Sequence, residues 1–515
     1  MGLQCYLRGM NEILGFLNGR RKIYTSEEEI TRDNVIRVVN EALEYHLTNM
    51  GEEEYLYWYR RGFQPKILRR NRKVRPELTK RIIINNANQV VVFKDGYFMV
   101  SETSYAPRED QYAEKVKRFN DYCIAADKGI ADNEIVDWFH TVGLGVQYLE
   151  PDKEGNEKTP LHIYALDPRS AFVVYSYRPG NDPVMGINMV IQGENLIIDV
   201  FTKKYKFLLE GGLTGIATSD SEQALPIVGT ATNVLKVEPN VIGEIPIIEY
   251  QYDNNRMGSF EIALPICDEI NEMQSRLAEG IEGNIQQLAV AWNCNFEEGT
   301  TANDIRERGM LVLRSTGDNK ADFKILETHL NQAETQTNID ALYDQLLDKT
   351  GLPSIARGEG GSSDNGSAVY LKSGYTIADT NRRNTEDLWR KSDKQFRKVA
   401  LKILKMKFTD FDLDPEDFNL EIEPPTMSNL LVKTQAALNM RTLGLSPQIW
   451  LERSGLSNDP IADIELSKDS IFEYYKTIKV EEKNPEEITK EEGEAEGTAL
   501  DDDRQVEELS SMNLD

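Results

Sequence analysis

Residue types that could hold a metal ion or attack a substrate are few and far apart in this sequence. The four cysteines, Cys5, Cys123, Cys267 and Cys294, form no CxxC pair, and the four histidines are equally scattered. Zinc and redox sites need such ligands at short, fixed spacing. The HExxH, EF-hand and GxxxxGK(S/T) motifs are also missing. The sequence therefore predicts reduced thiols and no cofactor, metal ion or common nucleotide-binding loop.

Carboxylates, the usual acid–base groups of hydrolases, suggest no active site either. Glu27–Glu29 and Asp501–Asp503 are runs of like charge, which more often face solvent than catalyse. Trp138–His140 contains a base, but no nucleophile or orienting residue stands beside it in the sequence. We therefore expect a protein that is not an enzyme.

Basic side chains are concentrated between residues 60 and 81. Ten basic residues stand there against a single acid, Glu77, and aromatic residues precede or open the cluster. Basic residues with stacking aromatics are typical of nucleic-acid surfaces. The other interpretation, which we favour, is a basic surface that pairs with carboxylates of an acidic protein. The candidate basic patch consists of Arg69, Arg70, Arg72 and Lys73.

Composition limits the class of protein. The chain has 515 residues, of which 40% are hydrophobic and 28% charged, so it can bury a sizeable core in several domains. Its net charge of −27 argues against a protein that grips nucleic acid over its whole surface. No apolar run approaches the roughly 18 residues that cross a membrane. Val480–Asp515 carries 14 acidic and 3 basic residues, which predicts a disordered tail.

Hydrophobic periodicity predicts the elements of the first half. Thr25–Glu29 has the residue types of a helix N-terminus, and apolar residues from Val35 onward continue at helical spacing for about 20 residues. Residues 82–104 predict short strands because they contain β-branched runs and a Lys94–Gly96 turn. Two helices are expected over 107–142, followed by a β-rich block over 143–250.

The second half is predominantly helical. The spacing predicts a helix over 265–292, a small α/β insert over 293–327, and a second helix that Gly351 and Pro353 close. The two helices could form a hairpin with the insert at its tip. A loop rich in glycine and serine follows over 354–367. The remaining expected elements are a long helix over 368–408, a strand over 419–422, and a helical region over 430–476 in which Ser446 and Pro447 start one helix.

Several short motifs, taken in order, resemble one family. They are Tyr57–Gly62 with Ile67–Arg70, Ile83–Asn86 with Val90–Val92 and Gly96–Tyr97, Asp167–Arg169, Pro246–Glu249 with Gly258–Glu261 and Asp268, and Gly366–Ala368 with Leu371–Lys372. Over residues 50–470 the chain resembles the portal proteins of tailed double-stranded-DNA bacteriophages. It looks closest to the large portal family common in phages of Gram-positive hosts.

The resemblance implies an α+β portal fold that assembles as a ring, usually of twelve subunits. The implied parts are an N-terminal arm and α/β wing (1–258), a first stem helix (259–292), a small α/β clip (293–328), a second stem helix (329–350), a tunnel loop (351–367), a long helix with the wing return (368–426), a helical crown (427–479) and the acidic tail (480–515).

The resemblance also implies a function. The ring would occupy one capsid vertex of the virion, after assembly in the host cytoplasm, and double-stranded DNA would be packaged and ejected through it. The implied partners are the large subunit of terminase, then a head–tail connector or adaptor protein, and the major capsid and scaffolding proteins, with no membrane. Two alternatives stay open: a structural or scaffold-like virion protein outside the portal family, and a nucleic-acid-binding adaptor that uses residues 60–81.

Candidate contact residues follow from the implied parts. The tunnel-loop candidates for contact with DNA are Arg357, Glu359, Ser363, Asp364 and Lys372. The clip candidates for partner contact are Glu297, Glu298, Arg306, Glu307 and Arg308, chosen because they are charged and lie in that segment. A glycine-rich loop can change conformation as DNA passes, and an acidic channel repels phosphates and lets DNA slide.

Overall fold

The computed structural model describes residues 19–72, 76, 79–99, 102–153, 156–193, 195–213, 229–285, 288–292, 294–295, 314–315, 322–326, 332–354, 375–422, 430–454, 456–457, 463–464 and 467. The chain divides into two units, Met1–Pro425 and Thr426–Asp515, and each is described by itself. Helices and sheets both contribute to the first unit, so the predicted α+β class is confirmed.

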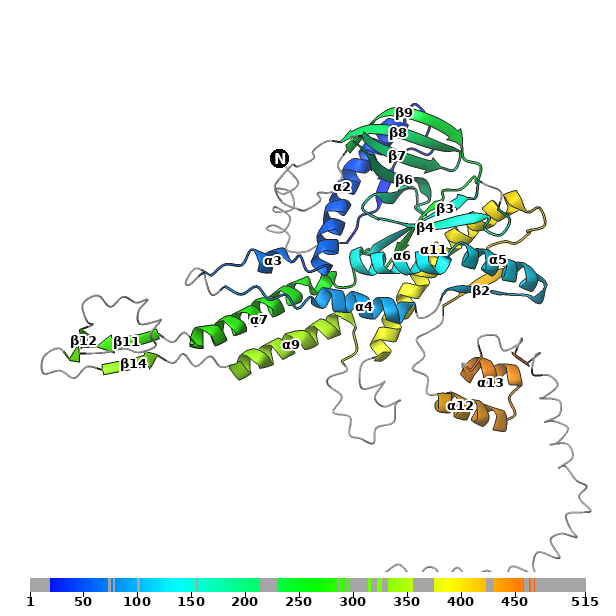
Figure 1. Ribbon diagram of the computed structural model, residues 1–515. Coiled ribbons are helices and arrows are strands. Elements are labelled where there is room, and N and C mark those ends of the chain that lie inside the picture. Colours follow the sequence, from blue (N-terminus) through cyan, green and yellow to red (C-terminus); the bar gives the residue numbers. More distant parts are fainter. Residues whose placement is uncertain are drawn as a thin grey trace, which may run out of the picture. The chain divides into compact units, whose positions relative to one another are not determined.

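A six-stranded sheet forms one layer of the first unit, in the order β1-β5-β6-β7-β8-β9. Its strands are β1 (Ile23–Thr25), β5 (Ala171–Ser176), β6 (Pro183–Gln192), β7 (Asn195–Thr202), β8 (Tyr205–Leu213) and β9 (Gly229–Pro239). β1 runs parallel to β5, and the other neighbours are antiparallel. Helix α2 (Val35–Arg60) packs on this sheet through Val35, Val38 and Val39 (Figure 1). Their helical spacing makes one apolar face, as predicted.

A three-stranded sheet, β10-β3-β4, shares a second core with three helices. These elements are β3 (Leu144–Pro151), β4 (Leu161–Leu166), β10 (Ile247–Gln251), α5 (Ala113–Ala125), α6 (Lys128–Val142) and α11 (Tyr375–Lys407). Trp389 and Phe396 of α11 are buried there with Phe119 and Tyr250. β2 (Ser104–Pro107) pairs antiparallel with β15 (Phe418–Glu421), so the chain after α11 returns to the segment before α5.

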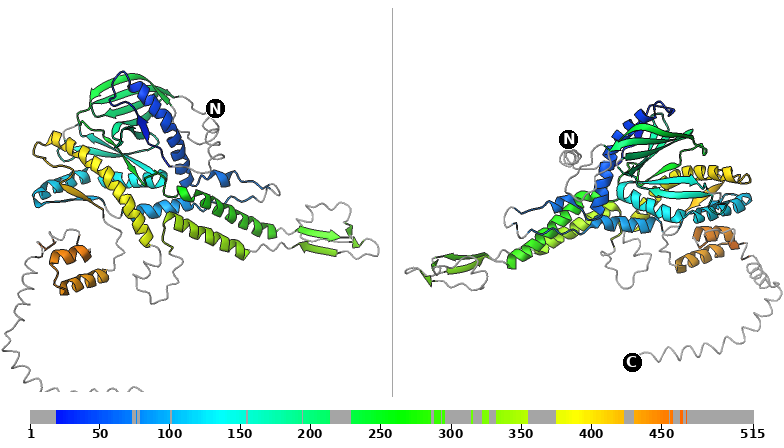
Figure 2. Two further views of the ribbon diagram at one scale, coloured as in Figure 1. Left: turned by 180° about the vertical axis from the view of Figure 1, so that it is seen from behind. Right: turned by 45° about the horizontal axis from the view of Figure 1, so that its top comes forward.

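Two neighbouring helices, α7 (Leu264–Ile285) and α9 (Gln332–Thr350), extend from this body (Figures 1 and 2). Cys267 of α7 and Leu346 and Leu347 of α9 belong to one buried cluster with α4 (Asn86–Phe98). Between the two helices the chain forms β11 (Leu288–Trp292), β12 (Cys294–Asn295), β13 (Arg314–Ser315) and β14 (Asp322–Leu326). β11 pairs antiparallel with β14, and β12 with β13. Two helices that flank a strand-containing insert are therefore present, as predicted.

The remaining elements are short. In the first unit they are α3 (Pro65–Leu68), η2 (Asp110–Tyr112) and η3 (Glu261–Ala263), and in the second unit α12 (Leu430–Thr442) and α13 (Pro447–Ser454). α13 begins at Pro447, as predicted, because the fixed backbone angle of proline suits the first position of a helix. The acidic tail, 480–515, lies outside the described residues.

The strands predicted over 82–104 are wrong among the described residues, since β2 begins only at Ser104. Residues 86–98 form helix α4 instead, and Asn85 before it has the left-handed conformation, with φ of 57°. Val90 and Val91 are fully buried in the cluster that α4 shares with α7 and α9. Burial of this face outweighs the weak preference of β-branched residues for strands.

Two predicted helix boundaries are also wrong. Ile23–Thr25 forms strand β1 beside β5, and α2 begins only at Val35. Residues 288–292 form β11 rather than the end of a helix, because their backbone pairs with β14. A short apolar run such as Leu288–Trp292 fits either structure by its periodicity, and the pairing partner decides.

Gly143 ends α6 with φ of 90°, and the chain turns there into β3. A Cβ at this position would lie 2.2 Å from the carbonyl oxygen of Arg256. Gly62 has nearly the same φ, 91°, but a Cβ there would meet nothing within 4 Å. We expect Gly143→Ala to lower the free energy of unfolding by about 3 kcal/mol and Gly62→Ala by only about 1 kcal/mol.

Urea denaturation followed by far-UV circular dichroism measures both alanine variants. Gly62→Ala is the matched control because it carries the same left-handed strain without the clash. If both variants lost the same free energy of unfolding, the clash between an added Cβ at position 143 and the Arg256 carbonyl would not be what destabilises Gly143→Ala.

Candidate functional site

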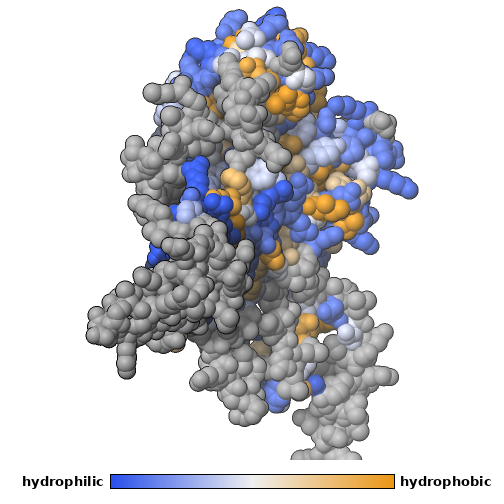
Figure 3. Space-filling model, turned by 60° about the vertical axis from the view of Figure 1, so that its left-hand side comes forward, coloured by the Kyte–Doolittle hydropathy of each residue, from blue (hydrophilic) through white to orange (hydrophobic). Residues whose placement is uncertain are grey.

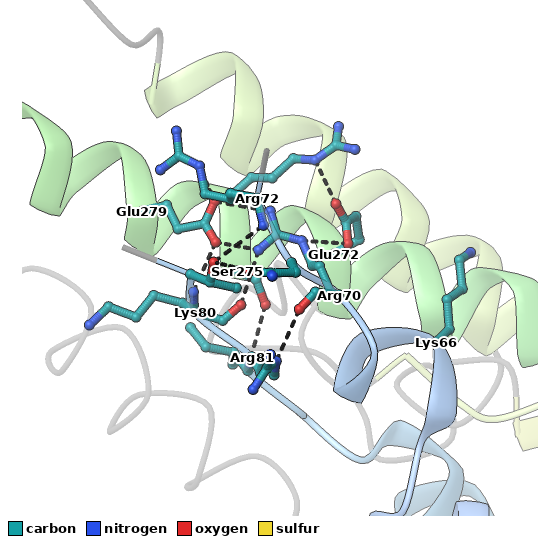
Figure 4. Close-up of polar contacts among 12 residues, drawn as sticks. Lys66, Arg70, Arg72, Lys80, Arg81, Glu272, Ser275 and Glu279 are labelled. Atoms are coloured by element: carbon teal, nitrogen blue, oxygen red, sulfur yellow. Dashed lines mark hydrogen bonds and ion pairs between the residues drawn. The ribbon is translucent and has the colours of Figure 1, made fainter. Parts of the chain in front are cut away.

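The basic cluster of the sequence starts at the end of α2 and then follows helix α7. We use "basic segment" for residues 60–81, of which 60–72, 76 and 79–81 are described. Gly62 turns the chain at the end of α2, and Pro65 starts the single turn of α3. The chain then passes along α7 until α4 begins (Figure 4).

One face of α7 is polar and holds this chain segment. Its members recur at three- and four-residue spacing: Asp268, Asn271, Glu272, Ser275, Glu279 and Glu282. We call them the α7 polar stripe. Helical geometry places such residues on one side of the helix. The buried Ile270 lies away from this stripe, and Cys267, at the edge of the stripe, is in the core cluster with α9.

Hydrogen bonds from backbone amides of the extended chain to side chains of the α7 polar stripe hold the two together. The amide of Lys80 donates to Glu279 over 2.9 Å, that of Ile82 to Ser275 over 2.9 Å, and that of Ile84 to Asn271 over 3.0 Å. Every second extended residue therefore meets every fourth helical residue. The two rises match, since two extended residues span about 6.6 Å and four helical residues about 6.0 Å.

Ion pairs reinforce this attachment (Figure 4). Arg70 bonds Glu279 through both terminal nitrogens, with 3.0 Å between Nη2 and Oε2, and its Nε lies 2.8 Å from Glu272. Lys80 pairs with Glu282 at 2.7 Å, and Arg72 lies 3.6 Å from Glu279. A guanidinium that bonds a carboxylate with two nitrogens is held more firmly than a single exposed pair.

These contacts shift the pKa of Glu279. Partial burial favours the neutral carboxyl, but hydrogen bonds from Arg70 and from the Lys80 amide outweigh it. The pKa of Glu279 therefore lies below its ordinary value, and the pKa of Glu272 is lowered for the same reason. The same bond to Glu279 raises the pKa of Arg70.

The sequence left two interpretations of the basic segment open, and the described residues fit the one based on carboxylate pairing. Arg60 pairs with Asp137 at 2.6 Å, and Arg70, Arg72 and Lys80 pair with α7. Arg69 and Arg81 remain exposed, and Lys66 only approaches Asp268 at 3.9 Å. Lys73 lies outside the described residues.

The other candidates lie outside the described residues. They are the tunnel-loop residues Arg357, Glu359, Ser363, Asp364 and Lys372, and the clip residues Glu297, Glu298, Arg306, Glu307 and Arg308. The described residues on either side of the tunnel loop are buried. Gly351, with φ of 70°, and Leu352 are buried after α9, and Tyr375 is buried at the start of α11.

Sequence reasoning missed the α7 polar stripe. The signal was present, because Asn271, Ser275 and Glu279 recur at four-residue intervals opposite the apolar spacing that predicted the helix. Their partners, however, lie about two hundred residues earlier in the chain. The spacing therefore indicates that α7 has a polar face, but it does not indicate that the basic segment covers this face.

Cys123, Cys267 and His140 are buried. Burial raises the pKa of both Cys123 and Cys267 to about 12, so these thiols stay protonated. His140 lies 2.6 Å from Asp95, and burial lowers its pKa. Within the described ranges, no three histidine, cysteine or acidic side chains group as metal ligands. No described helix is both long and apolar enough to span a membrane.

Removal of the Arg70 guanidinium tests the attachment to α7. We expect Arg70→Met to lower the free energy of unfolding by about 2 kcal/mol, because Glu279 and Glu272 would keep their burial and lose their main partner. The lowered pKa of Glu279 stabilises the fold above its ordinary value of 4.5. The difference from the native chain should therefore be complete above pH 4.5 and fade as the pH falls further.

Arg69→Met is the matched control, since Arg69 is the exposed neighbour of Arg70. Urea denaturation at several pH values measures both variants. If the two variants lose the same stability, or if the loss from Arg70→Met does not change in acid, the pairs with α7 are not what holds the segment.

Comparison with known proteins identifies the family. A family model described as phage portal protein, SPP1 Gp6-like, matches residues 40–476, which is most of the chain. No curated protein matches the chain. The matched range includes the six-stranded sheet apart from β1, the helix pair α7 and α9, and helix α11. The chain therefore belongs to the SPP1 Gp6-like family of phage portal proteins, which are structural components of the virion capsid.

Proposed function

We propose that the chain forms a ring, of twelve copies, at one capsid vertex, through which double-stranded DNA is packaged and later ejected. The observation that carries this proposal, beside the family match, is the helix pair α7 and α9 with paired strands between them. Two helices joined at one core and connected through a small insert make a rigid unit that can repeat around an axis. Rings of this kind arise when one interface repeats by rotation until it closes.

The parts of the portal fold are assigned on this basis. We assign the arm and wing to 1–258, the stem helices to 259–292 and 329–350, the clip to 293–328, the tunnel loop to 351–367, the long helix and wing return to 368–426, the crown to 427–479 and the tail to 480–515. Within the first stem segment, the regular helix is α7 and the last residues belong to β11.

Charge supports passage of DNA rather than tight binding. The chain carries a net charge of −27. Arg70 and Arg72, two of the four candidates for a basic patch, are paired with α7. Tight binding to DNA requires free cations that release condensed counterions, and a mostly acidic surface does not provide them.

The clip is the proposed docking site for terminase during packaging and then for the head–tail connector. The β11–β14 and β12–β13 pairs would give this surface a fixed frame, with the charged clip candidates in the connections. We assign contact with the capsid and scaffolding proteins to the wing. Partners that bind in succession need a shared surface of moderate size.

The native mass of the purified chain tests the proposal. Twelve subunits of 58.7 kDa would give a particle of about 700 kDa, whose images should show a ring. The chain should be measured alone and after co-expression with scaffolding and capsid proteins, since assembly can depend on them. Single subunits under both conditions would contradict the ring.

Arg357→Ala tests the tunnel-loop assignment. We expect less DNA per capsid with rings intact, because the guanidinium would supply a transient phosphate contact as DNA moves. Ser362→Ala, in the same loop but outside the set of candidates, is the control. Packaging equal to that of the native chain would remove Arg357 from the list of DNA contacts.

A further inference from the structure

The stem has two outer faces, separated by helix α7. The α7 polar stripe holds the basic segment, while α7 also packs against α9 in the cluster that contains Cys267, Leu346 and Leu347. Figures 1 and 2 show α3 and the chain after it on one side of α7 and α9 on the other. The basic segment and α9 are therefore the two flanks of one layered unit.

The flank formed by the basic segment carries excess positive charge. Its described part from residue 66 onward has six basic side chains, and the α7 polar stripe has four carboxylates. Those carboxylates are committed mainly to Arg70, Arg72 and Lys80. Arg69 and Arg81 are exposed, and on α7 itself the side chain of Arg276 is 64% exposed. A carboxylate on a neighbouring molecule could reach these cations.

The opposite flank is acidic. α9 buries Ile339, Leu346 and Leu347, and its exposed residues include Glu334, Asp340 and Asp348. Asp340 and Asp348 are both exposed and stand about two helical turns apart along α9. Lys349 is the single basic residue of this helix.

We propose that the exposed cations Arg69 and Arg81 of one copy contact Asp340 and Asp348 on α9 of the next copy. This inference rests on the proposed ring. A ring built by rotation joins two different faces of identical subunits, so opposite charges on the two flanks suit it. Charge complementarity of this kind also fixes register and rejects wrong pairings. Figure 3 shows hydrophobic and hydrophilic residues interspersed over the coloured part of the surface in that view.

A charge-exchange experiment tests the contact. One variant carries Asp340→Lys with Asp348→Lys, and the other carries Arg69→Glu with Arg81→Glu. Each variant alone would place like charges at every interface, so we expect each to lose the ring and run as smaller species by native mass spectrometry. An equal mixture should restore rings, because the two variants alternate and every interface again joins opposite charges.

Matched controls carry the same charge changes elsewhere on exposed positions. Glu114→Lys with Asp121→Lys on α5 matches the first variant, and Arg178→Glu with Lys204→Glu matches the second. Both controls should form rings like the native chain. Far-UV circular dichroism should show native helix content in all four variants.

The outcomes separate the two proposals. No ring from the native chain overturns the proposed function and this contact together. Native rings with rings from both variants overturn the contact alone, and so does a mixture that fails to restore rings. Rings from the Arg69 and Arg81 variant that retain less DNA would assign the basic flank to nucleic acid and overturn the contact as well.

Discussion

Lys128→Met is expected to lower the free energy of unfolding by about 3–5 kcal/mol. The side chain of Lys128 is 2% exposed and pairs with Asp132, four residues later on α6, whose side chain is fully buried. Its ammonium also donates to Thr103 Oγ1 over 2.9 Å. Methionine fills a similar volume but leaves a buried carboxylate without its cation.

The loss extends beyond one pair because Lys128 belongs to a buried network. Asp393 of α11 is fully buried, accepts from the Tyr105 hydroxyl over 2.7 Å and pairs with Arg397 at 2.9 Å. Burial raises the pKa of Asp393, and the charge of Lys128 opposes that rise. Without the lysine, Asp132 and Asp393 would repel each other in a poorly hydrated core.

Urea denaturation of the native chain and of two variants measures this effect. Lys117→Met is the matched control, since Lys117 is exposed on α5. The loss from Lys128→Met should shrink in acid, where protonated carboxyls no longer need the cation. A loss no larger than that of Lys117→Met would show that the network does not depend on the Lys128 charge.

The sequence predicted those helices whose buried face can be recognised from the spacing of their own apolar residues. The apolar spacing on α2, α5, α6 and α7 could be read directly, since each helix buries one face. α4 could not be predicted in this way. Its valines fit a strand equally well, and only the surrounding helices, distant in sequence, select the helix.

The candidate site was likewise predictable only where its features are local in the sequence. The basic segment and its pairing with acids could be proposed from composition, but the α7 polar stripe as its partner could not. Arg70 and Glu279 are 209 residues apart. The buried pair of Arg20 and Glu261 is separated by 241 residues and left no trace in the sequence pattern. Contacts of this kind depend on topology, which periodicity does not encode.

The second large effect concerns Glu53. We expect Glu53→Gln to be more stable than the native chain by about 5 kcal/mol above pH 8 and equally stable below pH 4.5. Glu53 is fully buried on α2, and neither carboxyl oxygen has a hydrogen-bond partner among the described residues. Burial raises its pKa from 4.5 to about 8, against the opposing charge of Arg20. Glutamine keeps the shape and cannot ionise.

The sign follows from proton binding. Between pH 4.5 and pH 8 the folded chain holds a proton on Glu53 that the unfolded chain releases. Stability at this residue therefore falls by about 1.4 kcal/mol per pH unit as the pH rises. Burial lowers the pKa of His46 to about 4 and that of Lys94 to about 7, and both give the opposite slope, His46 between pH 4 and 6.5 and Lys94 above pH 7.

The native profile alone therefore mixes groups with slopes of opposite sign, and the difference between Glu53→Gln and the native chain isolates Glu53. Urea denaturation at about pH 5, 6, 7 and 8 should give a difference that grows steadily with pH, while the exposed control Glu44→Gln gives none. A difference independent of pH would mean that Glu53 is ionised in the folded chain and stabilised by Arg20. In that case glutamine would lower stability, because Arg20 would lose one of its carboxylate neighbours and keep its burial.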